Sequence, residues 1–440
     1  MAIKLIKAQK FAIRSSLILC KLIFLSIMMI IIGGCKAQMM KTPNLYTNSN
    51  TNPFAKVATE FRDNKVDVLY VTDRKPTNQK GGSLKYGFKR SASMAYGSCI
   101  VELGKQISWN MLVENSIVRD RKDSIELNVL KVTENGRFPE TPLKLAEHEN
   151  EIVISPATKA LQTQMEEKLK LEIQRRLSLT SRKEAYVYVH GYHSPFEDSP
   201  LVIAQLWHFL GREGVPIAYS WPAGSPGLFR GYHYDRESGE FTIFHLKQFL
   251  KILASCPDLK KIHIIAHSRG TDVAGSALRE LFIEAKGEKI SPRLKFKIGN
   301  VILAAPDIDL DIVMQRFGAE RFFLGLDRMT IYVSRNDKAI GVSEWLFTSR
   351  RRLGQLRIED IPADDRESFR HVKRTYVIDA LVDVGASGHY YFYLSPAVSS
   401  DLILVLRDDL DPGKANGRPL TEVESNFWQL HDDYPNYSNP

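Results

Sequence analysis

Short apolar runs alternate with stretches of helical spacing along this chain of 440 residues, and no other feature limits its fold as strongly. Runs such as AYVYV, KIHIIA and GNVILA are continuously apolar, as expected of strands that are buried on both faces. Strands of this kind that alternate with helices predict the α/β class, a mostly parallel sheet with helices on both faces. The predicted strands are 66–71, 98–103, 185–189, 216–220, 261–266, 299–304, 329–333 and 375–378.

The helices are predicted from apolar residues that recur every three or four positions. Residues 239–253 and 273–282 each gather such residues on one face, and residues 158–178 form a charged amphipathic helix before the third strand. Residues 104–150 are rich in Asn and Lys with weak alternation, which indicates an irregular antiparallel excursion. One large domain over residues 61–408 accounts for the pattern.

Residues 1–34 have the layout of an export signal. Basic residues precede the apolar run 22–32, and small residues follow it in Gly33-Gly34-Cys35. The ending resembles the lipobox of bacterial lipoproteins, which implies that Cys35 receives a lipid and becomes the first mature residue. An uncleaved anchor over residues 15–34 is the alternative, although eleven apolar residues are few for a membrane span. Either case places the protein in the cell envelope, with the lipoprotein on the periplasmic or outer-membrane side.

The positive charge belongs to this signal rather than to a binding surface for nucleic acid. The formal charge is +9, but five of the 60 lysines and arginines lie in residues 1–34, which contain no acid. The rest of the chain carries 55 basic and 51 acidic side chains, so a global cationic field is not expected there. Residues 35–60 are polar and rich in Asn and Thr and predict a flexible tether, and residues 409–440 predict a surface tail.

The strongest chemical motif is Ala266-His267-Ser268-Arg269-Gly270, which lies between a predicted strand and a predicted helix. A small-x-Ser-x-Gly turn in this context forms a nucleophile elbow, because only small residues allow the tight turn that presents the serine hydroxyl. Ala266 replaces the more usual first glycine, a sterically mild change. The alternative is an ordinary serine at a helix N-cap. The motif favours Ser268 as a nucleophile.

A second motif, His190-Gly191-Tyr192, follows the strand 185–189. A glycine there allows a backbone N–H of Gly191 or Tyr192 to face an oxyanion together with the N–H of Arg269, the residue after the nucleophile. His190 and His193 with Glu197 or Asp198 are a weaker metal-site pattern. The sequence contains no phosphate loop, dinucleotide fingerprint or zinc spacing, so no cofactor and no metal are predicted.

The general base must follow Ser268 if the order is nucleophile, acid, histidine. Of His371, His389 and His431, His389 lies in a small-residue loop after the last predicted strand, which suits an imidazole placed over the serine. Two acids remain open as its partner. Asp337 follows the strand 329–333 and Asp307 follows the strand before it, and the position one strand before His389 favours Asp337.

Taken in order, these motifs resemble the α/β-hydrolase superfamily, and within it a bacterial branch catalogued as a domain of unknown function. The resemblance covers about residues 60–400. It implies an eight-stranded hydrolase sheet and a Ser268–Asp337–His389 triad, and it implies no substrate. The segments that carry it are Thr72-Asp73-Arg74, His190-Gly191-Tyr192, Ser220-Trp221-Pro222, Tyr232–Ser238, Ala266–Gly270, Ala304–Asp309 and Gly388-His389.

These observations predict a membrane-tethered serine hydrolase that cleaves an acyl ester or thioester of a small-molecule substrate, and carboxylic esters, thioesters and lipids all remain open as substrates. The alternative is a non-catalytic envelope binding module on a hydrolase scaffold, because fold does not determine function. A metal-dependent hydrolase that uses His190 and His193 is a more distant alternative. Cys99 and Cys256, which lie outside the signal and the lipidation site, are either paired or two buried thiols.

Overall fold

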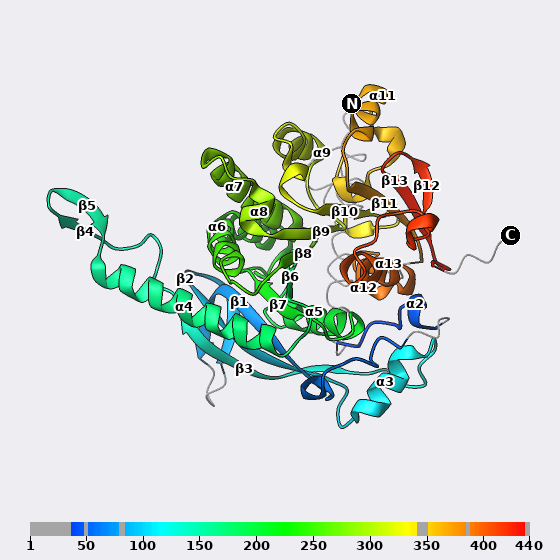
Figure 1. Cartoon of the computed structure of the whole chain (residues 1–440), viewed down its shortest axis with the longest axis horizontal. Helices are drawn as coiled ribbons and strands as arrows, with labels where there is room; N and C mark the ends of the chain where they lie inside the picture. The colour runs from blue at the N-terminus through cyan, green and yellow to red at the C-terminus, as the bar shows by residue number, and fades with distance from the viewer. Residues whose placement is uncertain (1–36, 48–51, 79–83, 341–350, 384–387, 436–440) are drawn as a thin grey trace, which may run out of the picture. The chain divides into compact units, whose positions relative to one another are not determined.

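The apolar runs of the sequence form the strands of one large twisted sheet in the computed structural model (Figure 1). The structure describes residues 37–47, 52–78, 84–340, 351–383 and 388–435, so the predicted export signal and Cys35 lie outside the described residues. The described residues from Met39 onward belong to one compact unit. Among the helices in the described ranges, none is both long and apolar enough to cross a membrane.

The sheet has eleven strands in the order β12-β13-β11-β10-β9-β8-β6-β7-β1-β2-β3. The strands from β13 to β1 in this order run parallel to one another, and β12 and β2 pair antiparallel with their neighbours. The strands are β1 Lys65–Asn78, β2 Leu84–Leu103, β3 Leu127–Arg137, β6 Glu184–Val189, β7 Val215–Ser220, β8 Lys261–His267, β9 Ile298–Ala304, β10 Arg328–Val333, β11 Thr375–Leu381, β12 Thr421–Glu424 and β13 Phe427–His431.

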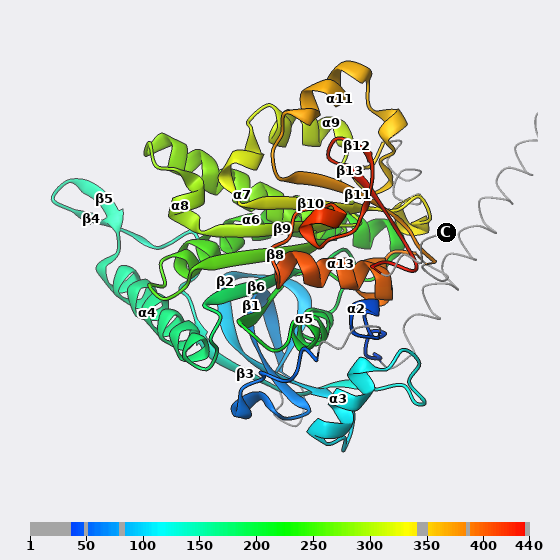
Figure 2. The same ribbon diagram turned by 45° about the vertical axis from the view of Figure 1, so that its right-hand side comes forward.

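Helices cover both faces of the sheet (Figures 1 and 2). Along β6, Val187 packs into the core beneath α4, α6 and α7, whereas Tyr186 and Tyr188 pack into the core beneath α5 and α13. This alternation follows from the two-residue period of a strand, and it leaves no wet face in the middle of the sheet. The longer helices are α3 Trp109–Ile117, α4 Pro156–Ser178, α5 Asp198–Phe209, α6 Leu228–Ala254, α7 Gly270–Gly287, α11 Ala363–Arg370 and α13 Pro396–Leu406; the short ones are α2 Asn44–Thr47, α8 Pro292–Phe296, α9 Leu310–Val313 and α12 Tyr391–Leu394.

The predicted α/β class is confirmed, but the predicted number of eight strands is too low. The eight predicted runs correspond to β1, β2 and β6 to β11, and the sequence reading misses β3, β12 and β13. β3 lies in the antiparallel excursion, where it pairs with β2; the excursion also contains α3 and a small hairpin of β4 Leu145–His148 and β5 Glu151–Ile154. Its polar residues weakened the alternation that would have indicated a strand.

From Met39 onward, the described residues of the segment predicted as a flexible tether pack on the domain. Met39, Met40, Tyr46, Phe54 and Val57 are all buried in the core on the α5 side. The Met39 N–H donates to the carbonyl of Ile125 at 2.8 Å. These apolar residues are spaced singly among Asn and Thr, so the composition of the segment is polar. The prediction of a flexible tether was wrong for the residues from Met39 onward because each apolar side chain is nevertheless buried against the domain.

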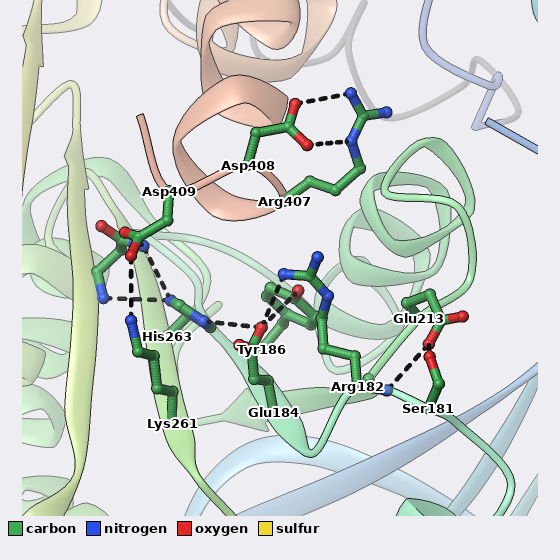
Figure 3. A network of polar contacts seen from close by, with 12 residues as sticks. Ser181, Arg182, Glu184, Tyr186, Glu213, Lys261, His263, Arg407, Asp408 and Asp409 are labelled. Carbon is green, nitrogen blue, oxygen red and sulfur yellow. Dashed lines mark hydrogen bonds and ion pairs between the residues drawn. The ribbon is translucent and has the colours of Figure 1, made fainter. Parts of the chain in front are cut away.

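The segment predicted as a surface tail also belongs to the domain, because it supplies β12 and β13 at the edge of the sheet. Figure 3 shows one of its contacts, in which Lys261 at the start of β8 lies 3.1 Å from Asp409. Nearby, Glu184 lies 3.3 Å from His263. Burial opposes ionisation of Asp409, but Arg328 and Lys261 hold the pKa of its carboxyl at about 2. These polar contacts occupy the edge where the parallel strands begin.

The two remaining cysteines lie on different elements and are not paired. Cys99 on β2 and Cys256 after α6 are both buried free thiols. Burial raises the pKa of Cys256 to about 11 and raises that of Cys99 as well. Neither thiol therefore has the lowered pKa that a reactive cysteine requires.

Candidate active site

Ser268 lies in a sharp turn between β8 and α7, where the carboxyl ends of the parallel strands meet. Its backbone has a φ of 53°, a left-handed conformation that is unusual for a residue with a side chain. The Ser268 N–H donates to the carbonyl of Ala304 at 2.9 Å, and its own carbonyl accepts from the N–H of Thr271 at 3.0 Å. These bonds hold the strained turn in place, as a nucleophile elbow requires.

The glycine two residues after the serine is required by close backbone packing. A Cβ atom at Gly270 would lie 2.3 Å from the carbonyl oxygen of His190 and 2.5 Å from that of Val189. A Cβ atom at Gly191 would lie 2.7 Å from the Cβ of Ser268. The end of β6 and the elbow therefore touch through two glycines, and this contact places Gly191 directly beside Ser268.

Two backbone N–H groups at this contact are available to a ligand. Neither the Tyr192 N–H nor the Arg269 N–H donates a hydrogen bond to any described residue. Arg269 directly precedes α7, so its N–H lies at the positive end of that helix. Both donors belong to residues that the sequence reading assigns to the oxyanion hole.

His389 lies close to the elbow, in the loop after β11. Its Nδ1 is 2.8 Å from Oδ2 of Asp337, whose side chain is fully buried. The other carboxylate oxygen of Asp337 accepts from the N–H groups of Ala339 and Ile340 at 3.0 and 3.2 Å. The acid is thus fixed by its own turn and oriented toward the imidazole.

His267, the neighbour of Ser268, connects the elbow to the histidine loop. Its Nε2–H donates to the carbonyl of His389 at 3.0 Å, and the two rings lie 4.6 Å apart. Burial, together with His389, holds the pKa of His267 well below its usual range, so it is neutral. The structure joins Ser268 and His389 through this residue, whereas no hydrogen bond links the Ser268 hydroxyl to Nε2 of His389.

Asp307, the second candidate acid, is placed differently from Asp337. One of its carboxylate oxygens accepts from the Tyr232 hydroxyl at 3.1 Å, and the other lies 3.5 Å from Arg352. Its backbone N–H donates to the carbonyl of Ser268 at 3.3 Å. Asp307 therefore contacts the elbow and Arg352. Of the two candidate acids, it is Asp337 that pairs with the imidazole of His389.

The metal-site pattern around His190 is not assembled as a ligand set. His190 is buried, stacked on Trp221 with ring centroids 5.0 Å apart, and its Nδ1 lies 2.8 Å from the carbonyl of Gly191. Burial and the nearby Arg74 guanidinium lower its pKa to about 3. Within the described ranges, no group of three or more His, Cys, Asp or Glu side chains is arranged to hold a metal ion.

Two buried charged residues near the site were not predicted. Asp235 on α6 accepts from the N–H groups of His193, Gly224 and Ser225 and so ties together the loops after β6 and β7. Burial raises the pKa of its carboxyl. Arg74 on β1 contacts the same two loops from the other side. Both residues lie in segments that carry the family resemblance, but nothing in their local sequence indicates a role.

Comparisons with known proteins identify the family. Residues 165–406 match the model of a family described as "Alpha/beta hydrolase of unknown function (DUF900)", which is more than half of the chain. Esterase B from Lactobacillus rhamnosis, described with a tributyrin phosphonate, is a similar solved structure. The match has 10% sequence identity and a TM-score of 0.27, and it covers 55% of this chain and 90% of the esterase chain. A lipase-esterase related protein from Clostridium acetobutylicum is another similar solved structure. That match has 11% sequence identity and a TM-score of 0.22, and it covers 57% of this chain and 86% of the other chain. No curated protein matches. The chain belongs to this family of α/β hydrolases.

Proposed function

We propose that the protein is a serine hydrolase of the esterase type, in which Ser268, His389 and Asp337 act on a small acyl ester or thioester. The contact of 2.8 Å between His389 and Asp337 carries the proposal, because it orients an imidazole on a loop that lies against the elbow. Nδ1 of His389 is occupied by Asp337, and Nε2 bonds no described residue. An imidazole held in this way can take a proton at Nε2.

The chemistry divides into two steps. In the first, the Ser268 hydroxyl attacks the acyl carbonyl while Nε2 of His389 takes its proton, and the imidazolium then protonates the departing alcohol or thiol. The Arg269 N–H and the Tyr192 N–H stabilise the negative oxygen of the tetrahedral intermediate. In the second step, a water molecule attacks the acyl-enzyme with His389 again as base, which releases the acid and restores Ser268.

This mechanism requires the Ser268 hydroxyl to reach Nε2 of His389 once a substrate is bound. The hydrogen bond between nucleophile and base is often long or absent without substrate, and the hydroxyl needs only a rotation about χ1 to change its direction. If the two groups cannot meet, the fold serves as a non-catalytic binding module instead. The experiment below separates these two cases.

We also propose that the enzyme is anchored to the cell envelope through a lipid on Cys35, which follows from the export signal and the lipobox-like ending at residues 32–35. A lipidated cysteine would make the protein peripheral to the membrane, with the whole described domain in the aqueous phase. Acyl transfer through a serine needs no cofactor.

The test is labelling of the full-length protein in mild detergent with a fluorophosphonate probe, which reacts with an activated serine. We expect the parent protein to be labelled and Ser268→Ala to be unlabelled. Ser276→Ala is the matched control. Ser276 is buried like Ser268, but it lies within α7 rather than in the turn, and its hydroxyl donates to the carboxylate of Asp272 at 3.4 Å. A folded parent protein that is not labelled would contradict the proposal and favour the binding module.

A further inference from the structure

Arg74 is a buried cation beside the candidate active site whose bonding partners are all neutral. It is 1% exposed and lies at an irregularity of β1, between two shifts of register with β2. Its five N–H groups donate to Ser220 Oγ at 3.0 Å, to the carbonyls of Gly87, Ala223 and Ser194 at 3.2, 2.8 and 2.8 Å, and to His190 Nε2 at 3.2 Å. Burial lowers the pKa of Arg74 to about 10, so it remains charged at neutral pH.

The contact with Arg74 determines which nitrogen of His190 carries the proton. A guanidinium only donates, so Nε2 must accept from Arg74, and a carbonyl only accepts, so Nδ1 must donate to Gly191 at 2.8 Å. The opposite tautomer would direct Nε2–H at the carbonyl of Trp221, 3.1 Å away. However, Nε2–H would then face an N–H of Arg74, and the unprotonated Nδ1 would face the carbonyl of Gly191. The neutral Nδ1–H form satisfies both contacts.

The hydrogen bond from His190 in turn fixes the peptide between Gly191 and Tyr192. In a trans peptide the N–H lies opposite to the C=O, so the Tyr192 N–H must point away from the ring of His190. That N–H bonds no described residue, and the Cα of Gly191 lies against Ser268. The chain of bonds from Arg74 through His190 to Gly191 therefore sets the direction of one candidate oxyanion donor.

We propose that Arg74 and His190 are positioning residues for the oxyanion hole. The proposal rests on the serine hydrolase function proposed above. Arg74 keeps His190 in its Nδ1–H tautomer, His190 holds the carbonyl of Gly191, and the Tyr192 N–H is presented to the substrate oxygen. Among the described residues, no carboxylate lies within salt-bridge distance of Arg74, although Asp73 and Asp235 act on its charge from farther away. Neither residue touches the reacting atoms.

A second buried pair of the same chemistry provides a matched control at the other end of α5. Arg212 is also 1% exposed, its Nε donates to Nδ1 of His208 at 3.1 Å, and its Nη1 donates to the carbonyls of Phe61 and Asp63. Burial holds the pKa of His208 well below its usual range, as it does for His190. Phe61 and Asp63 precede β1, so this pair lies at the edge where strands begin, away from Ser268.

The experiment compares Arg74→Met with Arg212→Met in the full-length protein. The rate of fluorophosphonate labelling, kcat and KM for p-nitrophenyl acetate, and the urea midpoint are measured for each. Both variants should lose stability. Arg74→Met should also lower kcat by about 10²–10³-fold with KM nearly unchanged, the loss typical of one oxyanion donor, whereas Arg212→Met should keep the parent kcat per folded molecule. Equal kcat in the two variants would overturn the proposal.

Two variants of His190 keep the test valid if Arg74→Met does not fold. Asn places an amide N–H near the position of Nδ1, so His190→Asn should retain much of the parent kcat, whereas His190→Leu should show the full loss. Because His389 is not touched, the pH dependence of kcat should be the same in all variants. Parent-level kcat in His190→Leu would overturn the positioning role alone. A parent protein that is neither labelled nor active would overturn the proposed function and, with it, this inference.

Discussion

At the scale of single residues, the candidate site depends on backbone contacts that only glycine permits. Ser268 is held at a φ of 53°, and a side chain in the left-handed region costs about 1–3 kcal/mol, which the surrounding structure must supply. The carbonyls at the end of β6 come so close to the elbow that Gly270 has no room for a Cβ atom. The strain at Ser268 is therefore maintained by the packing of β6 against the start of α7.

Replacement of Gly270 by alanine should destabilise the protein by about 1–3 kcal/mol, because the new Cβ would overlap two backbone carbonyls that cannot move independently. Urea denaturation followed by circular dichroism measures the change. Gly287→Ala, at the other end of α7, is the control, since no atom lies within 4 Å of its Cβ position. A Gly270 variant as stable as the Gly287 variant would contradict the packing argument.

Loss of the acid that orients His389 should reduce activity more than loss of the other candidate. Asp337→Asn keeps the shape of the side chain but favours the wrong tautomer of the imidazole, and it should lower kcat by about 10⁴-fold. Asp307→Asn changes contacts with Tyr232 and Arg352 and leaves the pair of His389 with Asp337 intact, so its effect should be much smaller. Fluorophosphonate labelling rates of the two variants decide the order, and a larger loss for Asp307→Asn would reverse the assignment.

These residues also show which parts of the site local sequence can indicate. Ser268 and Gly270 were predicted because the elbow is a continuous motif whose steric needs appear in five residues. Asp337 and Asp307 both follow strands in turns that favour Asp, so the sequence favours Asp337 by its position alone, and the tertiary structure shows which carboxylate pairs with His389. Arg74 and Asp235 were not predicted, since their partners belong to segments far away in the sequence and leave no pattern in the neighbouring residues.

At the scale of elements, the C-terminal strands are attached by a buried charge cluster on α13. Asp401 accepts from Arg418 at 2.8 and 2.7 Å, from the Tyr332 hydroxyl at 2.7 Å and from the Tyr434 hydroxyl at 2.6 Å. Asp401 and Arg418 are fully buried. Segment 409–434 reads as a tail because it is polar, but Arg418 and Tyr434 find their partner in the interior on α13, and composition alone does not reveal this pairing.

Removal of one partner of this ion pair should be costly. Arg418→Met leaves the Asp401 carboxylate buried without its cation and should lower the free energy of unfolding by about 3–5 kcal/mol. Asp401→Leu combined with Arg418→Met should recover part of that loss, because no charge is then left unpaired. Urea denaturation of both single variants and the double variant gives the coupling energy. Additive effects would show that the pair does not hold the C-terminal strands.

At the scale of the whole molecule, buried neutral histidines make stability depend on pH. His190, His208 and His267 all have pKa values lowered by burial, that of His190 to about 3. Below pH 6.5 the unfolded chain binds protons that the folded protein does not, so stability falls as pH falls, by about 1.4 kcal/mol per pH unit for each histidine. For His190 the loss continues down to its folded pKa of about 3.

Urea denaturation between pH 8 and pH 5 tests this dependence. The parent protein should be most stable above pH 6.5 and should weaken steadily below it. His190→Asn removes one of the titrating groups, so its stability should fall less steeply, by about 1.4 kcal/mol per pH unit. A variant with the same slope as the parent would show that His190 takes up its proton equally in both states.

Met39, where the compact unit begins, and Ser268 lie at opposite edges of the sheet. The Met39 N–H is bonded to Ile125, two residues before β3 begins and near the start of β1. Ser268 follows the last residue of β8, so it lies at the edge where the parallel strands end. A strand of six or seven residues is about 20 Å long, which separates the two edges by at least that distance.

If Cys35 carries a lipid, only three residues separate it from Met39, and an extended chain across the four peptide links reaches about 14 Å. The edge that bears Met39 and α3 should then face the bilayer, and the site should open toward the aqueous phase and accept soluble acyl substrates. Fluorophores on Met111→Cys, which is 53% exposed on α3, and on Asn336→Cys beside Asp337 test this orientation in vesicles with lipid-borne quenchers. Quenching is expected at position 111 and not at position 336. The reverse pattern would direct the site at the membrane and favour a lipid substrate. An unmodified Cys35 in mass spectrometry would exclude the lipid anchor.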